Sequence, residues 1–161
     1  MVCKGKSIKK GYYEYDPVIY PRKLWVMPQA TGAEIQSCFT EHDGDEIKWD
    51  DKDCFATTFT EVCSKADGKY GELVVFKGKT NMTMGNICHE ASHVLDAFMN
   101  VLPLAREYRG HNEHLSYLLQ WIGDCINRAR LGKGEFVEIK VDKGKADGNN
   151  KKNEVNEQNT L

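Results

Sequence analysis

Two long stretches of the sequence carry apolar residues at helical spacing. Over residues 84–102, apolar side chains recur every three or four positions, which is typical of a helix with one buried face. Thr80 or Thr83 could cap the start of this helix. The second stretch begins near Asn112, a good N-cap residue, and runs to about Arg130. The pattern therefore predicts two main helices.

Shorter stretches are typical of strands, because they alternate or are rich in β-branched and aromatic residues. The turn sequence Ala66-Asp67-Gly68 predicts a hairpin between two of them. Thr31 and Glu34 have the spacing of a capping box, which predicts a short helix to about Phe39, with a strand over 34–40 as the alternative. The strands are expected at residues 12–20, 23–27, 54–62, 69–76 and 135–141. This order predicts an α+β fold in which a small, mostly antiparallel sheet packs on two main helices.

The first helix contains an HExxH motif formed by His89, Glu90 and His93. The two histidines are one turn apart, so they project from the same face and can share one metal ion. Glu90 points about 100° away around the helix, from where it can act on a water molecule as general base. Asp96 and Asn100 fall within about 60° of the histidines, beside the apolar stripe. The motif predicts zinc-assisted hydrolysis; two exposed histidines without a ligand role are the alternative.

The start of the second helix offers a third metal ligand. Glu113 follows His93 after an interval of nineteen residues, long enough for the first helix to end and an antiparallel neighbour to begin. Two histidines and a glutamate, with the fourth position left for water, make a catalytic zinc set. His111 and His114 are alternative ligands. One observation stands against these assignments. The helix has an apolar arc roughly opposite Glu113, and on its own such a helix would leave this glutamate in solvent. The arc consists of Leu115, Leu118, Leu119, Ile122 and Ile126.

The HExxH motif, the interval and the following Asn-Glu-His-Leu-Ser segment resemble the gluzincin zinc metallopeptidases, the thermolysin-like clan. The resemblance covers about residues 80–130. The segment from the strand-like residues 71–77 into the first helix also looks like the small zincins of bacterial and phage genomes. The resemblance to the gluzincins implies that His89, His93 and Glu113 hold Zn²⁺, that Glu90 is the base, and that the fold is zincin-like. It also implies that the strand before the first helix, residues 71–77, is a sheet edge that aligns an extended peptide beside the metal.

The sequence departs from the gluzincin pattern at Tyr117, where the family has an aspartate. Asp96 and Asp124 are the remaining candidates for orienting a ligand histidine. The sequence ends about thirty residues after the second helix, so we expect any group that stabilises the reaction intermediate to be local, with Tyr117, His111 and His114 as the choices. A catalytically silent zinc-binding regulatory or interaction module is therefore the alternative to a zinc-dependent metallopeptidase.

The net charge bears on the expected partners, and the cysteine content bears on the expected cellular compartment. A net charge of -2 at pH 7 gives no basis for binding nucleic acid or an anionic membrane. The resemblance to the metallopeptidases implies a peptide or protein substrate. The six cysteines form no Cys-x-x-Cys pair, and no export signal precedes them, which favours reduced thiols in the cytoplasm. Oligomeric state is not predicted.

Composition also divides the 161 residues into three parts. Residues 1–10 are a basic lead-in that we expect to be flexible. Residues 11–141 are expected to form a single zincin-like domain. Residues 142–161 contain almost nothing apolar and are expected to be a disordered tail.

Overall fold

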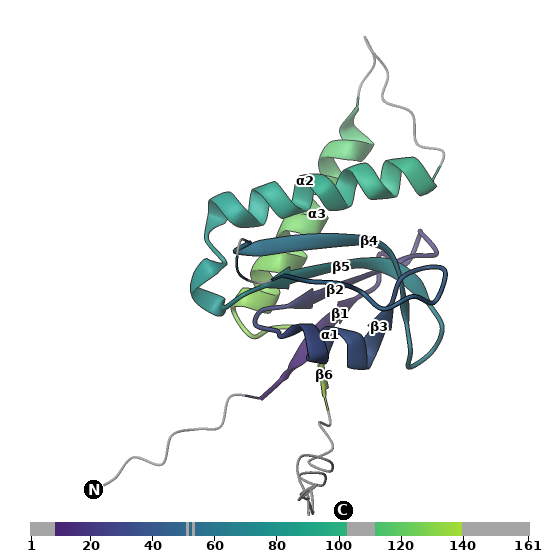
Figure 1. Ribbon diagram of the computed structural model, residues 1–161. Coiled ribbons are helices and arrows are strands. Elements are labelled where there is room, and N and C mark those ends of the chain that lie inside the picture. Colours follow the sequence, from purple (N-terminus) through teal and green to yellow (C-terminus); the bar gives the residue numbers. More distant parts are fainter. Residues whose placement is uncertain (1–8, 51, 53, 103–111, 140–161) are drawn as a thin grey trace, which may run out of the picture.

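The computed structural model describes residues 9–50, 52, 54–102 and 112–139. The fold is α+β, as the sequence predicts: a mixed sheet carries two long helices on one face and a short helix on the other (Figure 1). Most of the lead-in and the whole expected tail lie outside the described residues. Lys10 belongs to the folded part, because its carbonyl accepts a hydrogen bond from Ile139 N–H and its ammonium pairs with Glu34.

The sheet has six strands in the order β3-β4-β5-β2-β1-β6. Four of its five pairings are antiparallel, and the pairing of β2 with β5 is parallel. The sheet is therefore mostly antiparallel, with one parallel pair at its centre. The strand bounds are β1 Gly11–Tyr15, β2 Lys23–Met27, β3 Phe39–Thr40, β4 Ala56–Ser64, β5 Tyr70–Phe76 and β6 Glu135–Glu138.

The strand that lies beside α2 with a largely unpaired outer edge among the described residues is β4, not β5. β5 lies between β4 and β2, so the expectation that residues 71–77 form a sheet edge is wrong. The physical reason is visible in the sequence of β5, because a run of six buried residues, 71–76, needs partners on both sides and both faces. β4 pairs with β3 only through Cys63 and Ser64. Among the described residues, no strand pairs with the outer edge of β4 over residues 56–61.

Caps fix the starts of the helices. In α1, Gly32–Cys38, the capping box is present: Glu34 N–H donates to Thr31 Oγ1 at 3.4 Å, and Thr31 N–H donates to Glu34 Oε2 at 2.9 Å. The helix prediction is confirmed there, and the strand alternative holds only for the two residues of β3. α2, Met84–Val101, follows the one-turn 3-10 helix η1, Lys79–Asn81, and is capped by Thr83. α3 comprises Glu113–Arg130, with Asn112 at the N-cap position.

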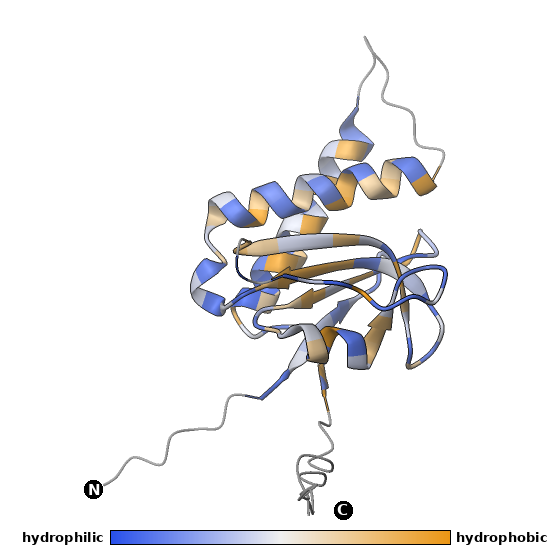
Figure 2. Ribbon diagram, viewed as in Figure 1, coloured by the Kyte–Doolittle hydropathy of each residue, from blue (hydrophilic) through white to orange (hydrophobic). Residues whose placement is uncertain are grey.

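Two apolar clusters fill the two faces of the sheet. The first joins β2 and β5 to α2 and α3, with Phe98 and Ile122 fully buried in it. The second lies between the sheet and α1, around Trp25 and Phe39. In Figure 2 the central strands are mostly orange, whereas both long helices alternate between orange and blue, as expected for helices that bury one side. No helix among the described residues is long and apolar enough to cross a membrane.

α3 buries one face against this first cluster. Leu115, Leu118, Ile122 and Ile126 are buried as the apolar arc predicts, but Leu119 is 38% exposed. Cys125 and Ala129 complete the buried face in its place. α3 packs against α2 and crosses it steeply, so that its first turn extends beyond α2 on the side away from β4 (Figure 1).

Candidate metal centre

The two histidines of the HExxH motif lie together on the exposed side of α2. Their Nε2 atoms are 3.2 Å apart and their rings meet edge to face. The polar stripe predicted from the sequence is confirmed, since His89, His93, Asp96 and Asn100 are all exposed and line the same cleft. Exposed nitrogens that converge in this way are open to a ligand from solvent.

The separation of the two imidazoles fits a shared zinc ion. With Zn–N bonds of about 2.0–2.1 Å and tetrahedral angles, two ligand nitrogens are about 3.3 Å apart. The Nε2 atoms of His89 and His93 are 3.2 Å apart, so both could bind one ion with little rearrangement. Neither Nδ1 atom has a hydrogen-bond partner among the described residues. A catalytic set needs three protein ligands, and in the described part of the chain no group of three His, Cys, Asp or Glu side chains could hold a metal ion.

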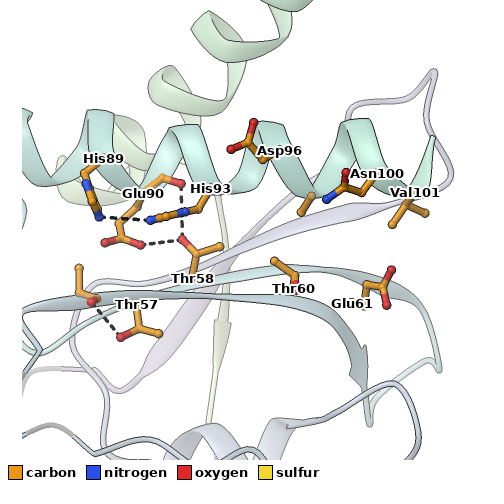
Figure 3. A pocket seen from close by; sticks show the side chains of 12 residues that line it. Thr57, Thr58, Thr60, Glu61, His89, Glu90, His93, Asp96, Asn100 and Val101 are labelled. Carbon is orange, nitrogen blue, oxygen red and sulfur yellow. Dashed lines mark hydrogen bonds between the residues drawn. The ribbon is translucent and has the colours of Figure 1, made fainter. Parts of the chain in front are cut away.

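Glu90 is the buried member of the motif, with only 4% of its surface exposed. Thr58 of β4 donates its hydroxyl to Glu90 Oε2 at 2.7 Å, and this hydroxyl also lies 3.4 Å from the Glu90 carbonyl oxygen (Figure 3). No described residue donates a hydrogen bond to Oε1. A carboxylate held through one oxygen, with the second oxygen unengaged, is suited to accept a proton.

The cleft beside these residues is formed by α2 and the outer end of the sheet. It has a volume of about 420 Å³, and the described residues that line it belong to α2 and to the first six positions of β4. Figure 3 shows the histidines and Glu90 at one end of the cleft, and Glu61, Asn100 and Val101 at the other. The free edge of β4 thus runs beside the two imidazoles.

The candidates on α3 do not line this cleft. Glu113 is exposed at the first position of α3, and the structure does not bring its carboxylate to the two histidines. His114 is exposed, and Tyr117 is 66% exposed on the same turns of α3. The crossing of α3 over α2 explains this position, because the first turn of α3 lies beyond α2 and away from β4 (Figure 1). His111 lies outside the described residues.

The two aspartates expected to orient a ligand histidine differ in position. Asp96 lines the cleft one turn after His93, but it makes no hydrogen bond to either imidazole. Asp124 is exposed on α3 and does not line the cleft. Neither aspartate therefore orients a histidine in this structure.

Two residues of the cleft were missed by reasoning from the sequence. Thr58 holds Glu90, and Glu61 lines the far end of the cleft from a bulge in β4. No local sequence signal pairs Thr58 with Glu90, because 32 positions separate them and only the packing of α2 on β4 brings them together. A threonine within an alternating strand is equally suited to face solvent.

The cysteines among the described residues are free thiols. Cys88, next to the first ligand candidate, is exposed, because it lies on the side of α2 that does not contact the sheet. Comparisons of the chain with known proteins found no match among protein-family models, curated proteins or solved structures.

Proposed function

We propose that this protein is a zinc-dependent metallopeptidase of a minimal, zincin-like gluzincin type. His89 and His93 are its histidine ligands and Glu90 is its general base. One observation carries the proposal: two exposed histidines with Nε2 atoms 3.2 Å apart lie beside a buried carboxylate, in a cleft bordered by a strand edge that no other described strand pairs with. Two surface histidines without a ligand role would not explain why a glutamate is buried next to them with a hydrogen-bond partner on another element.

Each residue of the cleft has a separate role in the proposed reaction. A zinc ion, when bound, supplies a Lewis acid that polarises a peptide carbonyl and lowers the pKa of water to about 7. Glu90 takes the proton from the attacking water and passes it to the leaving amine. Thr58 holds the carboxylate of Glu90 through Oε2, which leaves Oε1 for the proton transfer. General-base assistance of this kind contributes about 10²- to 10⁴-fold to the rate.

An extended peptide fits the outer edge of β4. Over residues 56–61 the backbone donors and acceptors on this edge have no strand partner among the described residues. A peptide that pairs there adds a strand to the sheet and runs along the cleft past the two histidines. Main-chain pairing provides affinity for an extended backbone of any sequence, which is why the proposed substrate is a peptide or an exposed protein segment.

The third ligand stays a prediction. Glu113 is the first choice, because it completes the two-histidine, one-glutamate set, and His111 and His114 are the alternatives. Glu113 begins α3 directly after residues 103–112, and a shift of this first turn toward α2 would be needed for the carboxylate to reach the histidines.

The substitution Glu90→Gln tests the base directly. It keeps the shape of the side chain and a carbonyl oxygen that can still accept from Thr58, but it cannot accept a proton. We expect zinc content equal to that of the parent and peptide turnover lower by about 10²-fold or more. The exposed Glu46→Gln, outside the cleft, is the matched control. Equal turnover of parent and Glu90→Gln on a broad peptide library would refute the general-base assignment.

The second candidate function is a catalytically silent zinc-binding regulatory or interaction module. It is favoured by the absence, among the described residues lining the cleft, of a hydroxyphenyl, lysine or arginine donor that could stabilise an oxyanion. The same library separates the two functions: bound zinc, an intact fold and no cleavage of any peptide by the parent would favour the module.

A further inference from the structure

The far end of the cleft contains a β-bulge in β4. Phe59 pairs with Leu73 and Val62 pairs with Gly71, so two residues of β4 stand opposite the single residue Glu72. Thr60 and Glu61, the two residues of the bulge, both line the cleft. Figure 3 shows the Glu61 side chain below Asn100 and Val101.

A buried ion pair lies opposite this bulge. Arg22 donates from Nε to Glu72 Oε1 at 2.9 Å and from Nη2 to the same oxygen at 2.5 Å, and Glu72 is fully buried. Burial raises the pKa of Glu72, while Arg22 and the backbone of Glu61 act in the opposite direction. Glu61 has a φ of 55°, which is uncommon for a residue other than glycine and persists only where its surroundings impose it. The ion pair and the fixed register on both sides of the bulge therefore define the position of Glu61.

Among the described residues, the charged side chains that line the cleft besides the histidines are carboxylates: Glu61, Glu90 and Asp96. No lysine or arginine in the described part of the chain lines the cleft. Asp96 is three residues beyond His93, about 4.5 Å along the helix axis, and Glu61, within the bulge, is about two strand rises beyond Thr58, about 7 Å. The acidic end of the cleft is thus set apart from the histidines by one to two residues of an extended peptide.

We infer that this end of the cleft recognises a lysine or arginine side chain of the peptide substrate, on the N-terminal side of the cleaved bond. The inference rests on the proposed function. β4 and α2 run in the same direction, because Thr58 lies at Glu90 and Glu61 lies at the end of the cleft formed by Val101. A peptide that pairs antiparallel with β4 places its N-terminal part next to Glu61. Its cationic side chain, one or two residues before the bond, then meets the carboxylates of Glu61 and Asp96.

The test uses three peptides that differ only at this position, which is lysine, norleucine or glutamate. Their binding to zinc-loaded Glu90→Gln protein is measured by fluorescence anisotropy, and their cleavage by the parent is measured in parallel. We expect the lysine peptide to bind about fivefold tighter than the norleucine peptide, with a difference that shrinks as salt rises. Adding Glu61→Lys should reverse the order in favour of the glutamate peptide, whereas adding Glu46→Lys, outside the cleft, should leave it unchanged.

Asp96→Asn provides a second variant that leaves the bulge untouched, and it should reduce the lysine preference without reversing it. Equal binding of the three peptides, or a lysine preference that survives Glu61→Lys in a variant with unchanged circular dichroism, overturns the inference. Cleavage without preference at this position also overturns it but leaves the proposed function standing. Failure of all three peptides to bind and to be cleaved counts against both.

Discussion

At the scale of the residue, a single hydroxyl group fixes the direction of the Glu90 carboxylate. Thr58 reaches across from β4 and donates to Oε2 at 2.7 Å, in a place where Glu90 is almost fully buried. A buried carboxylate that loses its partner bears the full cost of desolvation, about 1–3 kcal/mol or more. Thr58 is thus a positioning residue that acts through Glu90.

The substitution Thr58→Val removes this hydroxyl at nearly constant volume. We expect the free energy of unfolding to fall by about 1–3 kcal/mol and peptide turnover to fall with zinc content unchanged. The effect on turnover should lie mainly in kcat, because the peptide backbone still pairs with β4. Thr40→Val in β3 is the control, since Thr40 lies outside the cleft and its hydroxyl makes no hydrogen bond among the described residues. Unfolding and peptide-hydrolysis assays on both variants measure this, and equal behaviour of the two would contradict the role of Thr58.

At the scale of the element, local signals predicted much of the structure and long-range packing decided the remainder. The capping box of α1, the Thr83 cap of α2 and the strand at 23–27 depend on neighbouring residues, and they agree with the sequence analysis. The position of β5 inside the sheet depends on which strands pair with it, and the position of Glu113 depends on how α3 crosses α2. Hydrophobic periodicity gives the buried face of a helix but not its crossing angle, so the histidine pair was predictable and a completed ligand set was not.

The central parallel pair of the sheet requires a glycine at one position. A Cβ atom on Gly71 would lie 2.2 Å from the Lys23 carbonyl oxygen and 2.7 Å from the Trp25 ring. We expect Gly71→Ala to lower the free energy of unfolding by about 1–3 kcal/mol, because β2 and β5 must move apart. Gly123→Ala in α3, where nothing lies within 4 Å of the added atom, should raise it by about 0.5–1 kcal/mol. Urea unfolding of both variants checks the pair, and a Gly71→Ala protein as stable as the parent would contradict the close approach of the strands.

At the scale of the whole molecule, protonated groups are buried on both faces of the sheet. Burial raises the pKa of Tyr12 to about 12 on the α1 side, and it raises the pKa of Cys125 to about 12 on the α3 side. The unfolded chain loses these protons near pH 10 and pH 9, before the folded state does. The folded state therefore holds more protons in this range, and the free energy of unfolding must fall as pH rises from about 9 to about 12.

Replacing Tyr12 by Phe removes one of these groups without emptying its site. Between pH 9 and pH 12 the variant should lose about 1–2 kcal/mol less stability than the parent, since a shift of one pKa unit corresponds to about 1.4 kcal/mol. Urea unfolding at intervals of one pH unit measures the difference. Parallel curves for parent and variant would show that Tyr12 ionises as readily in the folded state as in the unfolded chain.

A bound zinc ion would connect two helices, because His89 and His93 of α2 would hold it in the cleft and a third ligand would come from the start of α3. Zinc titrations of Glu113→Ala, His111→Ala and His114→Ala identify that third ligand as the variant with the largest loss of affinity. Glu113→Ala is expected to show it, since two histidines and a glutamate form a catalytic set.

The most direct measurement is the zinc content of the purified protein after dialysis against zinc-free buffer, for the parent and for His89→Ala and His93→Ala. The account predicts about one zinc ion per chain in the parent and almost none in either variant, with circular dichroism showing that both variants stay folded. A folded parent that retains no zinc, or variants that retain as much as the parent, would contradict it.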